Sequence, residues 1–494
     1  MVKSMEKQRK KSVKVNFIMN AILNMSSFIF PLITFPYVSR VLSPTGYGKV
    51  SFATSVISYF VIIAQLGVPT YGIRACAKVR DDEDQLNQTV QEIFVISVIM
   101  CALTYVLFFL SMLFVPRFRE DKILFLIVSS SILFYTIGVE WLYKALEKYS
   151  YITIRSILFK FVALLAMFLM VRSEADYVIY GGISIFGAAA SNVMNFMYLP
   201  HVMKLKPAHR YELKKHLKPI AIFFGMSCAT TIYVHLDSVM LGFMKTDADV
   251  GYYNVAIKTK MILVSVITSL GTVLLPRVSY YIQNKMVEEF KVITKKALNF
   301  VIILSIPLTL YFILYAPESV YFLAGKEYEA SIIPMMIIVL TLPFIGMTNI
   351  MGIQILVPMG REKDVLYSEI AGAVVDLILN CLLIPKFASA GAAMGTLMAE
   401  IAVWIVQYRA LKEEVIPAYK SIHYRSIFLA LIGGGIASIW IKMLQWTPFF
   451  ALVASSVLFF AIYGGLLLLQ KEQLAWDILM QLKTMMLKKV KKEG

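Results

Sequence analysis

Long apolar segments follow one another along almost the whole chain, and short polar connections separate them. Each segment has about 18 residues or more, which is enough to cross the hydrocarbon core of a bilayer as an α-helix. This pattern predicts an all-α polytopic membrane protein, because a β-barrel would show alternating segments of about ten residues. We expect about fourteen transmembrane helices, at 15–38, 48–73, 89–115, 122–143, 150–171, 177–200, 219–242, 252–276, 293–316, 331–357, 365–385, 390–410, 425–442 and 448–469.

The polar connections divide the expected helices into groups. The connection at 201–218 is rich in Lys and His and lacks a long apolar run, as expected for a linker between two halves. The predicted organisation is a basic N-terminus at 1–14, a first lobe of six helices at 15–200, the linker at 201–218, a second lobe of six helices at 219–411, two further helices within 412–469, and an amphipathic basic tail at 470–494 on the membrane surface.

The two halves also resemble each other weakly. Three residues in and around the second expected helix match three in and around the eighth, and each pair is 203 positions apart. Both segments then have the same orientation in the membrane, so the halves are expected to be related by an axis near the membrane normal. Transporters built from such parallel repeats place the substrate path between them. The matched pairs are Gly48 and Gly251, Ala53 and Ala256, and Arg74 and Arg277.

Polar side chains recur at helical spacing on the first, second, seventh and eighth expected helices, which are the repeat-related pairs. Such residues inside a membrane helix face the bundle or a water-filled cavity in most membrane proteins. We therefore expect these helices to line a shared cleft, although Ser and Asn also join packed helices without lining any path. The cleft candidates are Asn20, Asn24, Ser55 and Gln65 in the first half, and Asp237, Asn254, Lys258 and Lys260 in the second.

The basic residues predict the orientation. Of the 48 Lys and Arg, 35 fall in the termini and connections on one side of the membrane and 10 on the other; the remaining three, Lys160, Lys258 and Lys260, fall inside the expected helices. The positive-inside rule then places both termini in the cytoplasm. The net charge of +17 is expected to face the anionic cytoplasmic leaflet rather than nucleic acid.

Other patterns disfavour several function classes. The four cysteines and five histidines show no disulfide or metal spacing. The acidic run "RDDEDQ" at 80–85 is interpreted as a solvated loop whose charges are balanced by nearby Arg and Lys. The chain contains no nucleotide-binding loop of the G-x-x-x-x-G-K-S/T type, which argues against ATP as the direct energy source. We therefore expect no enzyme, no cofactor and no metal.

Several stretches of the chain carry a resemblance to a known family. They are "PLITFPYVSRVLSPTGYGKVSFATSVISYF" at 31–60, "LGVPTYGIR" at 66–74, "LDSVMLGFMKTDADVGYYNVAIKTK" at 236–260, "VLLPRVS" at 273–279 and "NCLLIPKFASAGAAMGTLMAE" at 380–400. In these stretches the chain resembles the polysaccharide (oligosaccharide) flippases, the Wzx-like branch of the multidrug/oligosaccharidyl-lipid/polysaccharide exporter superfamily. Multidrug antiporters and lipid II flippases share the fold but not the "PYVSRVLSPTGYG" stretch at 36–48.

The resemblance implies two six-helix lobes around a central cavity, plus two C-terminal helices, in the inner membrane of a bacterium. It implies alternating-access translocation of undecaprenyl-pyrophosphate-linked oligosaccharide units from the cytoplasmic to the outer leaflet, for capsule or O-antigen assembly. The expected partners are the lipid-linked oligosaccharide, the bilayer and the polysaccharide polymerase machinery. One alternative is a cation-coupled drug or small-solute antiporter of the same fold, which the lysines of the eighth helix disfavour. A second is a membrane-embedded glycosyltransferase or polymerase, which the short outer connections disfavour.

Arg40 and Lys258 are the cations that we expect to handle the pyrophosphate, since Lys and Arg form charge-assisted hydrogen bonds to phosphate oxygens. Arg40 follows the first expected helix, and the run at 43–48 after it is expected to be a tight outer turn. The alternative for Arg40 is a purely structural one, in which its side chain extends to the outer membrane interface.

Three acidic residues inside expected helices carry further predictions. Asp237 is expected within ion-pair reach of Lys258 or Lys260, because an uncompensated charge there would cost several kcal/mol. Asp376 and Glu400, near the middle of the eleventh and twelfth expected helices, are candidates for proton or Na⁺ coupling. Packing against neighbouring polar groups is the alternative for both.

Overall fold

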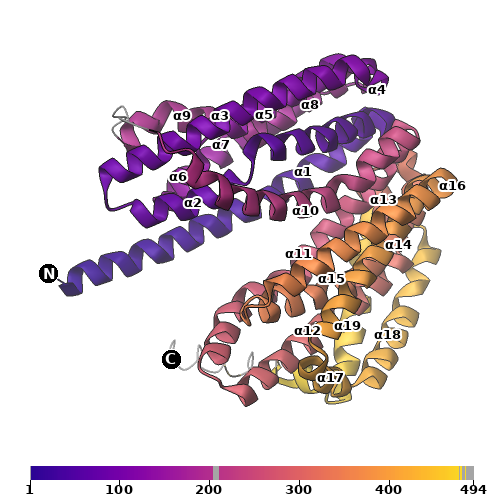
Figure 1. The fold of residues 1–494 in the computed structure, drawn as a ribbon. Coiled ribbons are helices and arrows are strands. Elements are labelled where there is room, and N and C mark those ends of the chain that lie inside the picture. Colours follow the sequence, from indigo (N-terminus) through magenta and orange to yellow (C-terminus); the bar gives the residue numbers. More distant parts are fainter. Residues whose placement is uncertain (1, 204–210, 478, 481–483, 485–494) are drawn as a thin grey trace, which may run out of the picture. The chain divides into compact units, whose positions relative to one another are not determined.

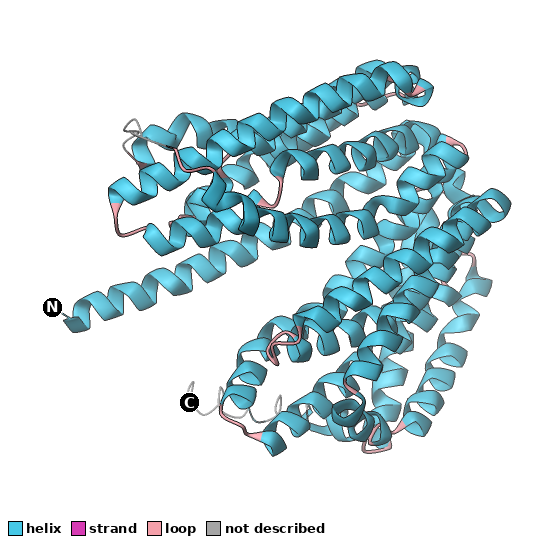
Figure 2. Ribbon diagram, in the orientation of Figure 1, coloured by secondary structure: helices cyan, strands magenta, loops and turns pink. Residues whose placement is uncertain are grey.

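The structure is a computed structural model that describes residues 2–203, 211–477, 479–480 and 484. Helices make up almost all of this part of the chain, and no strand occurs within it (Figure 2). The all-α membrane fold predicted from the sequence is confirmed. The chain divides into two compact units, Met1–Gly251 and Tyr252–Gly494.

The first unit is built around the long N-terminal helix α1, which packs against α3, α5, α7 and α10 (Figure 1). The short helix α2 packs against α3 and α6. The elements of this unit are α1 (Val2–Gln65), α2 (Val68–Val79), α3 (Glu83–Phe114), α4 (Pro116–Glu120), α5 (Lys122–Ile137), α6 (Glu140–Ala145), α7 (Tyr149–Met170), η1 (Glu174–Asp176), α8 (Tyr177–Ile185), η2 (Phe186–Ala190), α9 (Ser191–Val202) and α10 (Lys214–Met244).

The helix α11 (Asp247–Gln283) begins in the first unit and continues into the second. Within the second unit, α14 packs on α16, α12 packs on α15 and α17, and α18 pairs with α19. The further elements are α12 (Val287–Leu314), α13 (Ala316–Leu323), η3 (Lys326–Ser331), α14 (Ile332–Ile338), η4 (Val339–Thr341), α15 (Leu342–Thr348), η5 (Asn349–Leu356), α16 (Glu362–Ala410), α17 (Lys412–Lys420), α18 (Tyr424–Ile439), η6 (Trp440–Leu444) and α19 (Pro448–Leu469).

Ten helical segments of the described residues are long and apolar enough to cross a membrane, and two shorter ones, Lys122–Ile137 and Thr231–Met244, are also apolar. The two long helices α1 and α16 each contain one residue with non-helical backbone angles, Ser43 and Ala388. Each of these two helices extends over two adjacent segments that the sequence predicts as separate membrane helices. The count of fourteen stays a prediction.

The turn expected at 43–48 differs from the structure. Only Ser43 leaves helical geometry, with φ 57° and ψ 171°, and the helix resumes directly after it. Pro44 explains this, since the fixed φ of proline suits the first turn of a helix, where its missing N–H is not needed. Gly46 and Gly48 are therefore helical residues, and the small size of Gly48 matters for packing rather than for the turn.

The expected second helix at 48–73 is also interrupted. Leu66 and Gly67 have positive φ of 45° and 74°, and α2 starts after them in a new direction. A Cβ on Gly67 would lie 2.9 Å from the carbonyl oxygen of Ile220, so α10 passes close to this break. The start of α2 therefore packs closely against the first turns of α10, and Gly67 leaves the space for this approach.

Two predicted segments lie partly outside the described residues, namely the linker at 201–218 and the amphipathic tail at 470–494. The described start of the tail is attached to α12. Asn299 donates a hydrogen bond to the Glu472 carboxylate at 2.9 Å, and Lys296 pairs with Asp477 at 3.1 Å.

Candidate functional site

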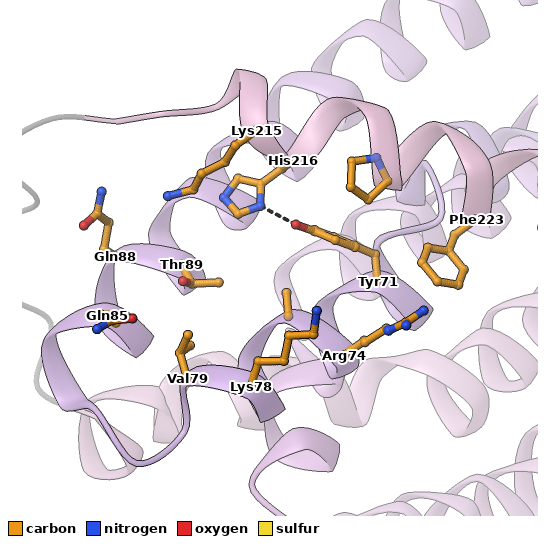
Figure 3. A pocket seen from close by; sticks show the side chains of 12 residues that line it. Tyr71, Arg74, Lys78, Val79, Gln85, Gln88, Thr89, Lys215, His216 and Phe223 are labelled. Carbon is orange, nitrogen blue, oxygen red and sulfur yellow. Dashed lines mark hydrogen bonds between the residues drawn. The ribbon is translucent and has the colours of Figure 1, made fainter.

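A pocket of about 490 Å³ opens in the first unit where α2, the start of α3 and the start of α10 meet (Figure 3). One part of its wall is aromatic and apolar, and the rest is cationic or carries amide and hydroxyl groups. The lining residues are Tyr71, Arg74, Ala75, Lys78 and Val79 from α2, Gln85, Gln88 and Thr89 from α3, and Lys215, His216, Pro219 and Phe223 from α10.

A buried carboxylate stands behind the α10 side of this pocket. The Glu92 side chain on α3 is 0% exposed and accepts hydrogen bonds from four donors. The ammonium of Lys215 and the ring nitrogen Nε2 of His216 lie 2.8 Å from one carboxylate oxygen. The backbone N–H of Glu212 donates to the other oxygen at 2.8 Å, and the side-chain amide of Gln88 donates to it at 3.0 Å. This set of bonds, the Glu92 cluster, attaches the beginning of α10 to α3.

The Glu92 cluster also determines the proton positions on His216. An ionised carboxylate only accepts hydrogen bonds, so Nε2 of His216 carries a proton. The other ring nitrogen, Nδ1, lies 2.6 Å from the hydroxyl of Tyr71 (Figure 3). In the neutral ring, Nδ1 accepts from this hydroxyl, and the chain of bonds from Tyr71 through His216 to Glu92 joins α2, α10 and α3.

The cations on α2 have a different environment. Arg74 and Lys78 are four residues apart and therefore lie on the same face of the helix. Both side chains are exposed, and within the described part of the chain neither makes an ion pair. Arg80, two residues further on, bonds the Glu147 carboxylate at 2.8 Å, and this bond raises the pKa of the Arg80 guanidinium. Of these three cations, Arg74 and Lys78, which make no ion pair in the described residues, line the pocket, whereas Arg80, which does, is not among its lining residues.

The acidic run at 80–85 does not neutralise these cations. The Asp82 side chain accepts hydrogen bonds from the backbone N–H groups of Asp84 and Gln85, at 3.1 and 3.0 Å, and so caps the start of α3. Asp81 lies 3.9 Å from Arg80. No metal-ligating group of three or more His, Cys, Asp or Glu occurs in the described residues, in this run or elsewhere.

The sequence-predicted site residues of the first unit are spread over α1 and α10. Asn24 and Arg40 are exposed, Asn20 and Gln65 are half-buried, and Ser55 is buried. The Arg40 guanidinium donates to the carbonyl oxygen of Pro36 in its own helix at 2.5 Å. The remaining candidate of this unit, Asp237, is buried in α10.

The predicted residues of the second unit fall into two groups. Asn254, Lys258 and Lys260 are half-buried on α11. The proposed ion pair of Asp237 with one of these lysines joins residues of different units and stays a prediction. The candidate coupling acids Asp376 and Glu400 are both buried, with 1% and 6% of their surface exposed.

The two coupling candidates lie on either side of the break at Ala388, where α16 has φ 47° and ψ −126°. The break brings the two parts of the helix together. A Cβ on Gly395 would lie 3.0 Å from the Asp376 carboxylate and would overlap the Asn380 amide oxygen. Next to it, the hydroxyl groups of Tyr253 and Thr396 lie 2.9 Å apart. Asp376 therefore lies in a buried polar region of the second unit.

Comparison with known proteins gives the family. Residues 13–282, just over half of the chain, match the model of the family described as "Polysaccharide biosynthesis protein". The chain belongs to this family. Residues 221–382 also match the MatE family model. These matches confirm the resemblance stated from the sequence.

Two curated proteins of similar sequence carry the name "Putative O-antigen transporter". The one from Escherichia coli (strain K12) is 24% identical over 398 residues, which is 80% of this chain and 95% of that protein. The one from Shigella dysenteriae is 23% identical over 405 residues, or 81% of this chain and 100% of that protein. A solved structure titled "Lipid II flippase MurJ, inward closed conformation" has a TM-score of 0.73 at 16% identity, covers 91% of this chain and 98% of its own, and supports the fold.

The pocket residues all fall inside the region matched by the polysaccharide biosynthesis family, but no pattern in the sequence distinguishes them as a site. The sequence pattern predicts instead that Arg74 and Lys78 balance the acidic loop at 80–85 and that His216 belongs to the linker at 201–218. One signal was present, because Glu92 is a carboxylate inside the expected apolar helix at 89–115. Lys160 on α7 also has no role in the prediction from sequence. In the structure its ammonium donates to the hydroxyls of Ser26 and Ser27 on α1 at 2.9 Å each.

Proposed function

We propose that this protein is a flippase that moves lipid-linked oligosaccharide units across the membrane during surface polysaccharide assembly. The observation that carries the proposal is the match of residues 13–282 to the polysaccharide biosynthesis family. Relatives named as putative O-antigen transporters, aligned over nearly their whole lengths, support transport rather than catalysis. A lipid II flippase with the same fold supports a lipid-linked substrate.

The transport problem is a physical one. A glycan and a pyrophosphate lose their hydrogen bonds to water in hydrocarbon, so they do not cross a bilayer unaided. In our proposal the substrate head crosses in a polar cleft while the prenyl chain stays in the lipid. Asn20, Asn24 and Ser55 would hydrogen-bond sugars, and Arg40 and Lys258 would balance the pyrophosphate charge.

The carrier, the direction of transport and the membrane are those that the family resemblance implies, and the orientation and coupling residues are those expected from the sequence. The carrier is undecaprenyl pyrophosphate, and translocation runs from the cytoplasmic to the outer leaflet of a bacterial inner membrane by alternating access. Both termini are cytoplasmic, in accordance with the distribution of Lys and Arg. Asp376 and Glu400 couple transport to a proton or Na⁺ gradient.

Deletion of the gene tests the proposal. Lipid-linked repeat units are extracted from the deletion strain and from the complemented strain, and a membrane-impermeant reagent that oxidises sugars reports the leaflet in which they lie. We expect repeat units to accumulate, protected from the reagent, in the deletion strain alone. Repeat units that reach the outer leaflet at the normal level would contradict the proposal. Failure to make the units at all would favour a glycosyltransferase, and a change limited to drug resistance would favour an antiporter.

A further inference from the structure

The pocket between α2, α3 and α10 carries more positive charge than its own structure requires. Arg74, Lys78 and Lys215 line it together with His216, and within the described residues no carboxylate lines it. Glu92 lies behind the wall and its charge is matched by Lys215. Two cations, Arg74 and Lys78, are then left without a balancing charge in the described part of the chain.

These two cations repel each other, because like charges four residues apart on a helix are neighbours. Both belong to the same face of α2 and both line the same cavity. Figure 3 shows the Lys78 side chain directed toward the paired side chains of Tyr71 and His216. A bound anion would remove the repulsion and satisfy both groups.

The neutral groups in the pocket narrow the chemistry of that anion. Arg and Lys form strong charge-assisted bonds to phosphate oxygens, and Arg adds a planar fork that matches two of them. The hydroxyl of Thr89 supplies a neutral donor from the α3 side, while the amides of Gln85 and Gln88 already donate to the carboxylates of Asp82 and Glu92. This combination of charged and neutral donors is suited to a phosphate group with several oxygens.

The remaining wall suits a carbon chain attached to the phosphate. Tyr71, Pro219 and Phe223 form an apolar surface beside the cations, and the rings of Tyr71 and Phe223 lie 6.4 Å apart. The pocket lies at the start of α3, a helix long and apolar enough to cross a membrane, so we expect it at the level of the lipid headgroups. A ligand with an anionic head and an apolar tail would contact both surfaces.

We propose that this pocket binds the anionic phosphate headgroup of a membrane lipid. The shared chemistry fits two sources, the pyrophosphate of a polyprenyl carrier and the headgroup of an anionic phospholipid. The first source rests on the proposed function, and the second does not. In either case Arg74 and Lys78 contact the phosphate, and Tyr71 and Phe223 contact the chain next to it.

Equilibrium binding to the purified full-length protein tests this assignment. The probes are farnesyl pyrophosphate and dioleoyl phosphatidylglycerol, with the zwitterionic dioleoyl phosphatidylcholine as the reference lipid. We expect Arg74→Gln and Lys78→Gln each to weaken binding about tenfold, which is the scale of one lost charge-assisted bond. Lys78→Arg should keep most of the affinity. The matched control is Arg80→Gln, which removes one positive charge outside the pocket and should change affinity less than about twofold.

The pattern across the two probes identifies the source. Weakened binding of the pyrophosphate alone assigns the site to the carrier, weakened binding of phosphatidylglycerol alone assigns it to the bilayer, and weakened binding of both indicates a general lipid phosphate site. If neither Arg74→Gln nor Lys78→Gln differs from Arg80→Gln for either probe, the proposal is overturned. The leaflet assay of the deletion strain is independent of these affinities, so failure of the proposed function is recognised separately.

Discussion

Gly48 and Gly251 lie against each other in the first unit at a close backbone contact. A Cβ on Gly48 would lie 2.9 Å from the backbone nitrogen of Gly251 and would overlap the carbonyl oxygen of Asp247. A Cβ on Gly251 would overlap the carbonyl oxygen of Pro44. The two glycines are also a matched pair of the weak internal repeat, so equivalent points of the repeated sequence meet each other.

Replacing Gly48 by Ala is expected to destabilise this contact by about 1–3 kcal/mol, the range for overpacking a closely packed site. The clash is with backbone atoms, which cannot rotate away as a side chain can. Thermal unfolding of the detergent-solubilised protein measures the effect. Gly46→Ala is the matched control, since its Cβ would have no neighbour closer than 3.4 Å. Equal unfolding temperatures for the two variants would show that the backbone around Gly48 shifts to accommodate the methyl group with no loss of stability.

Glu92→Gln is expected to lower the free energy of unfolding by about 2 kcal/mol, because it removes the charge that Lys215 and His216 bond. Lys215 is 44% exposed and regains water, so the loss stays below that of a fully buried pair. Chemical or thermal unfolding in detergent provides the measurement. Glu212→Gln is the control, because its exposed side chain lies 3.8 Å from Lys215 and an exposed pair contributes little. A Glu92 variant as stable as this control would show that the buried carboxylate does not hold α10.

Asp376→Asn and Glu400→Gln are expected to change how transport depends on the proton or Na⁺ gradient. Each variant keeps the size of the side chain but removes its negative charge. A coupling cation needs that charge to bind. Transport of lipid-linked oligosaccharide in vesicles is measured while each gradient is varied separately. Glu362→Gln at the exposed start of α16 is the control. An unchanged gradient dependence in both buried variants would leave these acids with a packing role.

Lys258→Ala and Arg40→Ala are each expected to block surface polysaccharide while the amount of protein in the membrane stays near normal. The reason is that sugar-binding amides and hydroxyls cannot balance the charge of a pyrophosphate. Lys258→Arg and Arg40→Lys should retain part of the export, because they keep the charge. Immunoblots of membranes and of surface polysaccharide measure both quantities. Normal export by the Ala variants would assign Arg40 to the bond with its own helix, to Pro36.

The all-α membrane fold could be predicted from the sequence because a membrane helix needs about twenty apolar residues whatever it packs against. The sequence did not predict that only Ser43 would form the first break, because the preference of Pro44 for a helix start competes with the turn preference of the glycines around it. The sequence predicts a connection at 386–389, but nothing in it points to Ala388 as the residue that breaks the helix, since alanine rarely adopts positive φ.

The pocket was missed for a different reason. Tyr71, Arg74 and Lys78 are more than 130 positions from Lys215 and His216 in the sequence, and nothing in the spacing of the residues shows that α2 and α10 meet. The only early sign was Glu92, since a carboxylate in an apolar helix requires partners. Those partners can be identified only once α2, α3 and α10 are seen to pack together, because no single segment contains all of them.

The Glu92 cluster has a consequence for synthesis of the chain. Its bond to the backbone of Glu212 joins positions 120 residues apart, and membrane helices α5, α7 and α8–α9 lie between them in the sequence. The carboxylate therefore enters the membrane well before Lys215 and His216 leave the ribosome, with Gln88 as the one donor of the cluster made by then. A nascent or truncated chain that ends before residue 211 therefore contains a poorly compensated acid in an apolar helix, and this cost is relieved only when the start of α10 is made.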